Sequence, residues 1–181
     1  MSITLLNQTR YPAQYVIQKG QQVIARVPEV APGARASIPV DGVYEVIATT
    51  VIEGNTYTSA PLTVSGSMGF LAQVLQVPSQ GTYEFDMVMF QNAAPDQLAF
   101  QKTCINPVTF TISKNGKSLQ NVVVNSSFRT ETLYISNTLS IYAVIAGVTS
   151  DRVTTANPKA IVTAVTDNTD LESGYFTLVI S

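Results

Sequence analysis

Residues 82–89 read Thr-Tyr-Glu-Phe-Asp-Met-Val-Met, and the first six positions alternate strictly between polar and apolar side chains. In an extended chain the aromatic and methionine side chains share one face, and the threonine, glutamate and aspartate side chains share the other. This period of two predicts a strand with one face in the core and the other in water.

Similar stretches recur along the chain and are rich in Val, Ile, Thr and Tyr, which favour strands. They cover residues 13–19, 43–51, 56–64, 108–113, 139–148, 160–165 and 175–180. Turn signals such as Asp41-Gly42, Glu53-Gly54-Asn55 and Asn115-Gly116 lie between them. Many short strands at this spacing predict an all-β sandwich or barrel.

One stretch is ambiguous. Phe70-Leu71-Ala72-Gln73-Val74-Leu75 places its apolar residues at i, i+1, i+4 and i+5, a spacing that also fits a short helix. Its length does not separate the two possibilities. We expect a strand here and leave the helix open.

The chain also contains an internal similarity. Residues 11–20 and 106–116 share a proline, an aromatic residue, an isoleucine, a lysine and a glycine turn in the same order. The offset stays near 95 residues over further matches, which predicts a duplication. We therefore expect two tandem, internally duplicated antiparallel β-sandwich domains, residues 1–93 and 97–181, joined near Asn92–Asp96. Between Pro61 and Gly81 the first half carries about four additional residues.

Composition excludes several kinds of chemistry. The 181 residues include no histidine, no tryptophan and one cysteine, Cys104. A Ser-His-Asp group, an imidazole metal site, an internal disulfide and a thiolate zinc site are therefore excluded. Ten basic and twelve acidic residues give a net charge of −2, which provides no electrostatic footprint for nucleic acid. Cys104 is expected to be an inert core or edge thiol.

Targeting signals are also lacking in the sequence as it stands. No secretory signal is visible at the N-terminus, and no apolar stretch has the length of a transmembrane helix. We expect no transmembrane segment and a location that is cytoplasmic or reached by a non-classical export route.

Three groups of residues are candidates for a site. Tyr11, Tyr57 and Phe128 lie near turns, where an exposed ring can stack on a sugar; the alternative is a local packing role. Met68, Phe70 and Leu71 form an apolar tip flanked by Gly and Ser, which predicts either partner contact or packing between the halves. Asp167, Asp170 and Glu172 offer oxygen ligands of the kind Ca²⁺ prefers, although a solvated turn is the favoured explanation for them.

These observations favour a non-enzymatic structural or interaction protein that self-associates or binds a partner through neutral sheet faces and edges. A surface with few charges opposes self-association weakly, so we expect a homo-oligomer and no cofactor. The first alternative is a lectin-like carbohydrate-binding protein with one site in each repeat. The second is a secreted cytolysin or toxin component.

Overall fold

The computed structural model describes residues 1–92, 94–167 and 175–181, and these residues form β-strands and no helix. The predicted all-β fold class is therefore confirmed. The first nine strands are β1 (Ser2–Asn7), β2 (Ala13–Lys19), β3 (Gln22–Val30), β4 (Arg35–Pro39), β5 (Tyr44–Ile52), β6 (Asn55–Thr58), β7 (Leu62–Val64), β8 (Met68–Val77) and β9 (Thr82–Phe90). The last nine are β10 (Gln97–Lys102), β11 (Val108–Lys114), β12 (Lys117–Val124), β13 (Glu131–Tyr134), β14 (Leu139–Ile145), β15 (Val148–Thr149), β16 (Val153–Thr155), β17 (Ile161–Thr166) and β18 (Phe176–Ile180).

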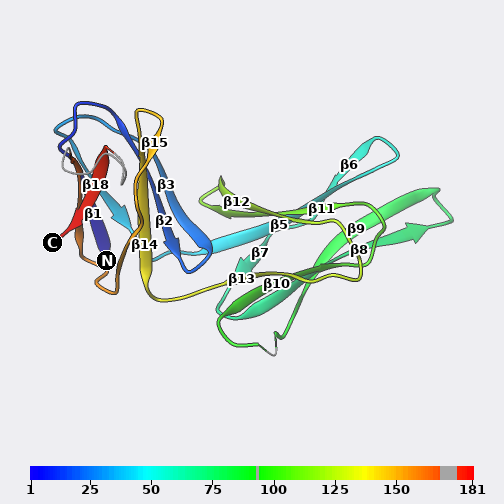
Figure 1. Ribbon diagram of the computed structural model, residues 1–181. Helices are drawn as coiled ribbons and strands as arrows, with labels where there is room; N and C mark the ends of the chain where they lie inside the picture. The colour runs from blue at the N-terminus through cyan, green and yellow to red at the C-terminus, as the bar shows by residue number, and fades with distance from the viewer. Residues whose placement is uncertain (93, 168–174) are drawn as a thin grey trace. The chain divides into compact units, whose positions relative to one another are not determined.

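The strands belong to two compact units. Unit 1 consists of residues 1–42 together with residues 136–181, and unit 2 consists of residues 43–135 (Figure 1). The chain therefore leaves unit 1 after β4, completes unit 2 from β5 to β13, and returns to unit 1 with β14.

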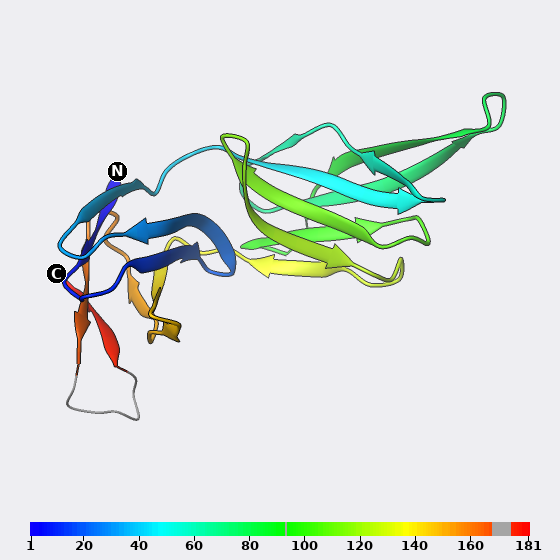
Figure 2. The same cartoon turned by 90° about the horizontal axis from the view of Figure 1, so that it is seen from above.

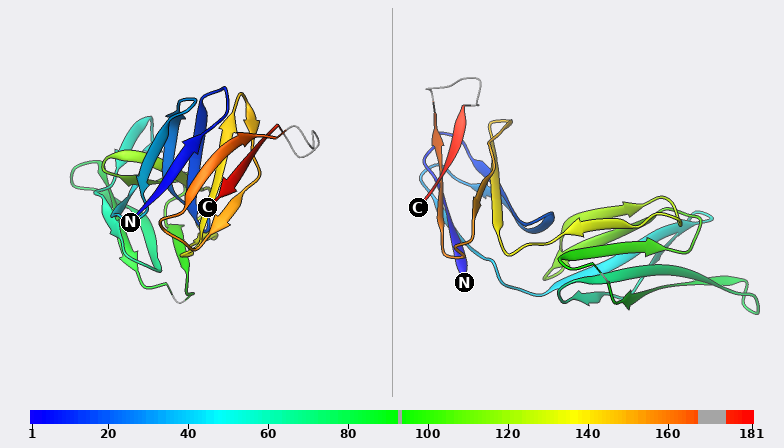
Figure 3. Two further views of the ribbon diagram at one scale, coloured as in Figure 1. Left: turned by 90° about the vertical axis from the view of Figure 1, so that its left-hand side faces the viewer. Right: turned by 60° about the horizontal axis from the view of Figure 1, so that its bottom comes forward.

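Unit 1 contains two sheets, with the strand orders β18-β17-β1-β4 and β15-β14-β2-β3; β16 also pairs with β14. The first strand, β1, pairs in parallel with β17, so segments from the two ends of the chain lie side by side (Figure 3). Tyr15 on β2 is fully buried, and its hydroxyl donates a hydrogen bond of 2.7 Å to the carbonyl oxygen of Leu6 on β1. This bond ties the two sheets together. Burial raises the pKa of Tyr15 to about 12, and a backbone hydrogen bond at Ala164 opposes the rise.

Unit 2 also contains two sheets, with the orders β13-β10-β8-β9 and β12-β11-β5-β6; β7 also pairs with β5. Side chains from both sheets meet in one core. Phe70 on β8 stacks on Phe100 of β10 at a ring distance of 5.6 Å, and Phe100 lies 5.1 Å from Phe110 on β11 of the facing sheet. Stretch 70–75 is therefore part of a strand, as expected.

The division into units differs from the tandem halves that the sequence predicts. The expected boundary near 92–96 lies inside unit 2, between β9 and β10. Strands of the first half pair with strands of the second half in both units: β1 with β17, β2 with β14, β5 with β11 and β8 with β10. The physical reason is that similar segments present similar edges. Sequence similarity identifies which segments are alike, but it does not say with which segment each one pairs.

Three tight hairpins follow from turn chemistry. At Glu53-Gly54, Asn115-Gly116 and Ala146-Gly147 both residues have positive φ, from 49° to 81°. Two consecutive residues with positive φ form the type I′ turn, whose twist matches the twist of the strands it connects. Glycine at the second position adopts this conformation at low cost.

The β8–β9 hairpin extends past the end of the neighbouring strand β10. Residues up to Ala72 of β8 pair with β10 as well as with β9, whereas in the described pairings residues 73–77 pair with β9 alone. Figure 2 shows this hairpin, in green, extending beyond the neighbouring strands of unit 2. β8 has ten residues, and it lies in the stretch where the first half carries its additional residues.

Candidate interaction surface at the loop end of unit 2

Two loops emerge at one end of unit 2. Loop 103–107 joins β10 to β11, and loop 125–130 joins β12 to β13. Their ends are neighbours in the sheets, because Val108 pairs with Val124 and Phe100 pairs with Glu131. We call these two loops, with the β5–β6 turn beside them, the loop end of unit 2.

The loop end presents two fully exposed apolar side chains. Ile105 is 93% exposed and Phe128 is 101% exposed, more than any other large apolar side chain among the described residues. Val51, at the adjoining end of β5, is 52% exposed. Exposed apolar side chains scattered singly are normal, whereas a group at one end of a domain marks a contact surface.

Hydrogen bonds hold loop 103–107 in place. Lys102, only 3% exposed, donates from Nζ to the carbonyl oxygens of Cys104 at 2.7 Å and Ile105 at 3.2 Å. Asn106 donates from Nδ2 to the carbonyl oxygen of Val51 at 2.9 Å. Hydrogen bonds from a charged donor are stronger than neutral ones. The backbone that carries Ile105 is therefore anchored on both sides.

Loop 125–130 is held by a smaller set of contacts. The backbone N–H of Arg129 donates to the carbonyl oxygen of Ser126 at 3.3 Å, which closes a turn around Phe128. Gln101 on β10 donates from Nε2 to Thr130 Oγ1 at 2.9 Å. Arg129 and Glu131 form an exposed ion pair of 3.3 Å, so the charges beside Phe128 are matched.

The residues expected to bind a ligand do not gather in one place. Phe128 lies at the loop end of unit 2. Tyr57 lies half-buried on β6, where its ring meets Tyr83 edge-on at 6.4 Å. Tyr11 belongs to unit 1 and is 51% exposed.

The apolar tip expected at residues 68–71 is part of β8. Met68 is 7% exposed and Phe70 is fully buried in the core of unit 2, while Leu71 is half-buried. Neither Met68 nor Phe70 is presented to a partner. The packing alternative accounts for them, with the packing inside one unit.

Of the acidic residues considered for metal binding, Asp170 and Glu172 lie outside the described residues. Asp167 is described, and its backbone N–H donates to the carbonyl oxygen of Tyr175 at 2.9 Å. Among residues 1–92, 94–167 and 175–181, no three His, Cys, Asp or Glu side chains are grouped in a way that suits a metal ion.

A groove in unit 1 surrounds Tyr11. Its volume is about 380 Å³, and it is lined by Arg10, Tyr11, Thr166, Tyr175 and Phe176. Tyr11 meets Phe176 edge-on at 6.1 Å, and Tyr175 lies 6.0 Å from the same ring. Both tyrosines are 51% exposed, so each keeps an accessible ring surface.

Asn7 anchors the loop that carries Tyr11. Its side chain is buried and donates from Nδ2 to the carbonyl oxygens of Tyr11 at 2.7 Å and Val30 at 2.8 Å. Its Oδ1 accepts hydrogen bonds from the backbone N–H and the hydroxyl of Thr9. Asn7 therefore anchors the backbone of this loop by side-chain hydrogen bonds, as Lys102 anchors loop 103–107.

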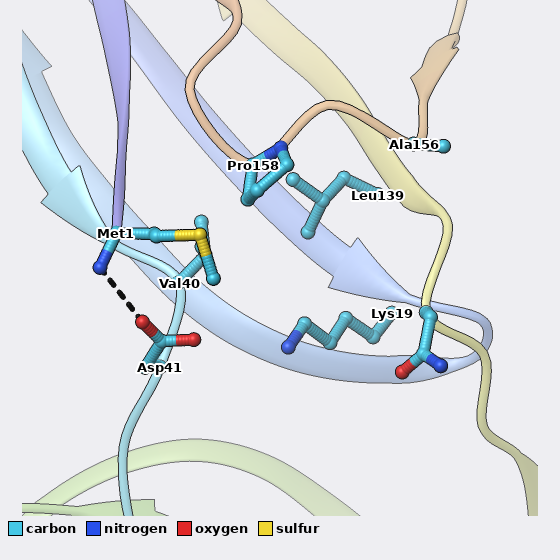
Figure 4. A pocket seen from close by; sticks show the side chains of 8 residues that line it. Met1, Lys19, Val40, Asp41, Leu139, Ala156 and Pro158 are labelled. Carbon is cyan, nitrogen blue, oxygen red and sulfur yellow. Dashed lines mark hydrogen bonds and ion pairs between the residues drawn. The ribbon is translucent and has the colours of Figure 1, made fainter.

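A second cavity in unit 1, of about 250 Å³, is shown in Figure 4. Its walls are largely aliphatic, from Met1, Val40, Leu139 and Pro158. The amino group of Met1 forms an ion pair of 2.7 Å with Asp41, but both groups are more than half exposed. An exposed ion pair contributes little, so this cavity offers no built polar site.

Sequence reasoning missed Ile105 and Lys102. Ile105 stands directly before the turn signal Asn106-Pro107. Turns lie at the surface, so an isoleucine in this position is not expected to be part of the core. That position was the available signal. Lys102 gave none, because a lysine at a strand end is ordinarily solvated.

Comparisons with known proteins found no match to this chain. No protein-family model matches it, and neither a curated protein nor a solved structure does. In the described part of the chain, no helix is long and apolar enough to cross a membrane.

Proposed function

We propose that this chain is a non-enzymatic interaction protein whose contact surface is the loop end of unit 2, and that its first partner is a second copy of itself. The observation that carries the proposal is the full exposure of Ile105 and Phe128 on anchored, neighbouring loops. Binding residues are commonly presented on loops that a rigid scaffold positions.

The energetic argument concerns burial. Covering one large apolar side chain that is otherwise exposed yields about 1.5–3 kcal/mol. Because Lys102, Asn106 and Gln101 already hold the loops, little conformational entropy is lost when a partner covers them. Two such side chains therefore supply a hot spot of about 3–6 kcal/mol.

The charge distribution supports an association that depends weakly on salt. The chain carries 22 charged side chains in 181 residues, and the charges beside Phe128 form a matched pair. Screening acts mainly on exposed unmatched charges, so added salt has few interactions to weaken.

The test compares the full chain with the double variant Ile105→Ser/Phe128→Ser by sedimentation equilibrium over a concentration series. We expect the wild-type chain to self-associate and the variant to do so at least about 100-fold more weakly, as the lost burial predicts. Val179→Ser is the matched control, because Val179 is also exposed, at 51%, but lies on β18 of unit 1. A wild-type chain that stays monomeric, or a double variant that associates equally well, would overturn the proposal.

We propose carbohydrate binding by the groove of unit 1 as the second candidate function. The specific support is the pair of half-exposed tyrosines, Tyr11 and Tyr175, in a groove that Arg10 also lines. Aromatic faces stack on sugar rings, and the planar guanidinium of arginine donates several hydrogen bonds. NMR titration with a panel of simple glycosides is expected to shift signals of the groove in the wild type and not in Tyr11→Ala. Tyr134→Ala, an exposed tyrosine of unit 2, is the control.

We infer in addition that the two units are built from two copies of one nine-stranded sequence, β1–β9 and β10–β18. In each copy the first strand makes one parallel and one antiparallel pairing: β1 with β17 and β4, and β10 with β8 and β13. The β2–β3 ladder has a bulge between Ile17 and Gln18, and the β11–β12 ladder has one between Ile112 and Ser113, 95 positions later.

Side-chain bonds repeat in the same way. Ser59 Oγ accepts from the Ala48 backbone N–H at 2.9 Å, and Ser150 Oγ accepts from the Ala143 backbone N–H at 2.9 Å. Under this correspondence Arg10 and Tyr11 of unit 1 stand where Ile105 and Asn106 stand in unit 2. The groove chemistry is therefore specific to unit 1, which limits the carbohydrate hypothesis to one site.

A further inference from the structure

The two copies do not fold separately in this chain. Unit 1 holds β1–β4 of the first copy and β14–β18 of the second, while unit 2 holds β5–β9 of the first copy and β10–β13 of the second. Each unit thus combines four strands of one copy with five of the other. This is the arrangement of a strand-exchanged dimer whose two members have been joined into one chain.

The contacts between the two segments of unit 1 are extensive and non-covalent. β1 and β17 share four register pairs, and β2 and β14 share seven. Leu5 of β1 faces Val162 of β17 in that register, and both side chains are fully buried. Segment 1–42 therefore completes segment 136–181 through ladders and core packing alone.

Only two short stretches connect these segments to unit 2. Four residues separate β4 from β5, and four separate β13 from β14. At the start of the first stretch, the backbone N–H of Val40 donates a hydrogen bond to the carbonyl oxygen of Met1 in unit 1. At the start of the second, the backbone N–H of Ile135 donates to the carbonyl oxygen of Asp96 in unit 2. The remaining residues of each stretch act as the hinges at which an exchanged segment changes partner.

We propose that a second copy of this chain is a partner through strand exchange: segment 1–42 of one copy completes segment 136–181 of another. The exchanged assembly forms every pairing of unit 1 that the single chain forms, so the two differ mainly in the entropy of joining chains. Protein concentration during folding therefore decides between them. Repeated exchange gives either a closed pair or a head-to-tail series of chains. The inference rests on the duplication inferred above and not on the loop end of unit 2.

The test uses a disulfide that forms only between exchanged segments. Gln14 on β2 and Val144 on β14 are register partners that line the same shallow cavity of unit 1, and neighbouring strands bring Cα atoms within the range a disulfide spans. Two full-length chains, Gln14→Cys and Val144→Cys, both with Cys104→Ser, are unfolded, mixed and refolded under oxidising conditions at high and at low concentration.

Strand exchange predicts a covalent pair of unlike chains that is abundant after refolding at high concentration and falls on dilution. The control mixes Gln14→Cys with Ser126→Cys, which places the second thiol on loop 125–130 of unit 2. Covalent pairs no more abundant than in this control, at every concentration, would overturn the proposal. Since both thiols lie in unit 1, adding Ile105→Ser/Phe128→Ser to both chains leaves the expected result unchanged. A failure of strand exchange is thereby distinguished from a failure of loop-end association.

Discussion

Cutting the chain in the connection from β9 to β10 tests whether both units combine strands from the two halves of the sequence. A protease recognition sequence is inserted between Ala94 and Pro95, in the connection from β9 to β10, and the folded full-length chain is then cleaved. If both units combine strands of both copies, the two fragments stay together after cleavage. They separate only when both units lose their sheets.

The free energy that holds the two fragments together can be estimated from the buried core. The twelve largest fully buried side chains among the described residues include Tyr15 in unit 1 and Phe100 in unit 2. At about 1.5–3 kcal/mol each they represent about 18–36 kcal/mol, and crediting half to contacts between the fragments leaves about 9–18 kcal/mol. Association costs roughly 4–15 kcal/mol, and the second unit forms without a second loss of translational freedom. Binding at micromolar concentration needs a net of about 8 kcal/mol, which the upper part of this range supplies. Because four strand ladders also join the fragments, β1–β17, β2–β14, β5–β11 and β8–β10, we expect them to remain bound at that concentration.

Size-exclusion chromatography with light scattering measures the outcome. The cleaved protein is expected to elute with the mass of the intact chain, and a denaturing gel confirms that cleavage is complete. The uncleaved insertion variant shows that the inserted sequence itself leaves the fold unchanged. Two separate fragments that each retain strand circular dichroism would refute the reasoning, because they would show that each copy folds alone as a tandem domain.

Two further substitutions test individual contacts. Because the pKa of Tyr15 is about 12 when folded and near 10 when unfolded, its contribution is present below pH 10 and is lost as the pH rises to 12. Urea unfolding of wild type and Tyr15→Phe should therefore converge by about 2–3 kcal/mol across that window, and parallel curves would contradict the cause assigned to the shift. Lys102→Met removes the two hydrogen bonds that its ammonium group donates to loop 103–107 and leaves the one from Asn106, so Cys104 should react with a thiol reagent at least about 10-fold faster. Lys117→Met, at an exposed lysine, is the control, and equal rates in all three proteins would show that Lys102 does not hold the loop.

Local patterns predicted the strands because each depends on neighbouring residues. The alternation at 82–89 corresponds to β9, and the ambiguous stretch 70–75 belongs to β8. No local period decides the second case. What decides it is pairing on both sides, with β9 and β10, and the position of Phe70 against Phe100.

The pairing of strands from the two halves of the chain could not be predicted from the sequence, for a different reason. β1 pairs in parallel with β17, and β10 pairs in parallel with β8, so each pairing joins strands that are far apart in the sequence or separated by another strand. Which pairing forms depends on the connections from β4 to β5 and from β13 to β14, and short connections carry no periodic signal. The predicted boundary near 92–96 is a true connection between strands, but it joins β9 to β10 inside one unit.

The candidate sites also depended partly on local sequence and partly on distant strands. Phe128 was recognised because a phenylalanine inside a polar turn is conspicuous, and it is fully exposed. For Met68 and Phe70 the sequence left partner contact and packing open, because the Gly and Ser residues before them resemble a flexible tip; both are buried, and β8 begins at Met68. The burial of a residue depends on the strands that cover it, and those strands come from distant parts of the chain.

Under the inferred duplication, the loop after β1 corresponds to the loop after β10. Under that duplication Asn7 stands where Lys102 stands. Asn7 donates one hydrogen bond into the loop that follows its strand, to the carbonyl oxygen of Tyr11, and one to that of Val30, whereas Lys102 donates both of its hydrogen bonds into loop 103–107. The amide and the ammonium are chemically different donors, yet both fix the backbone of the next loop. The residues carried by those loops then differ in kind: Tyr11 lines a groove with an aromatic wall, whereas Ile105 is an exposed aliphatic tip. If the two halves are copies, the anchoring is kept while the tip changes, so the scaffold accounts for their similarity and the loop tips are where different binding chemistry is expected.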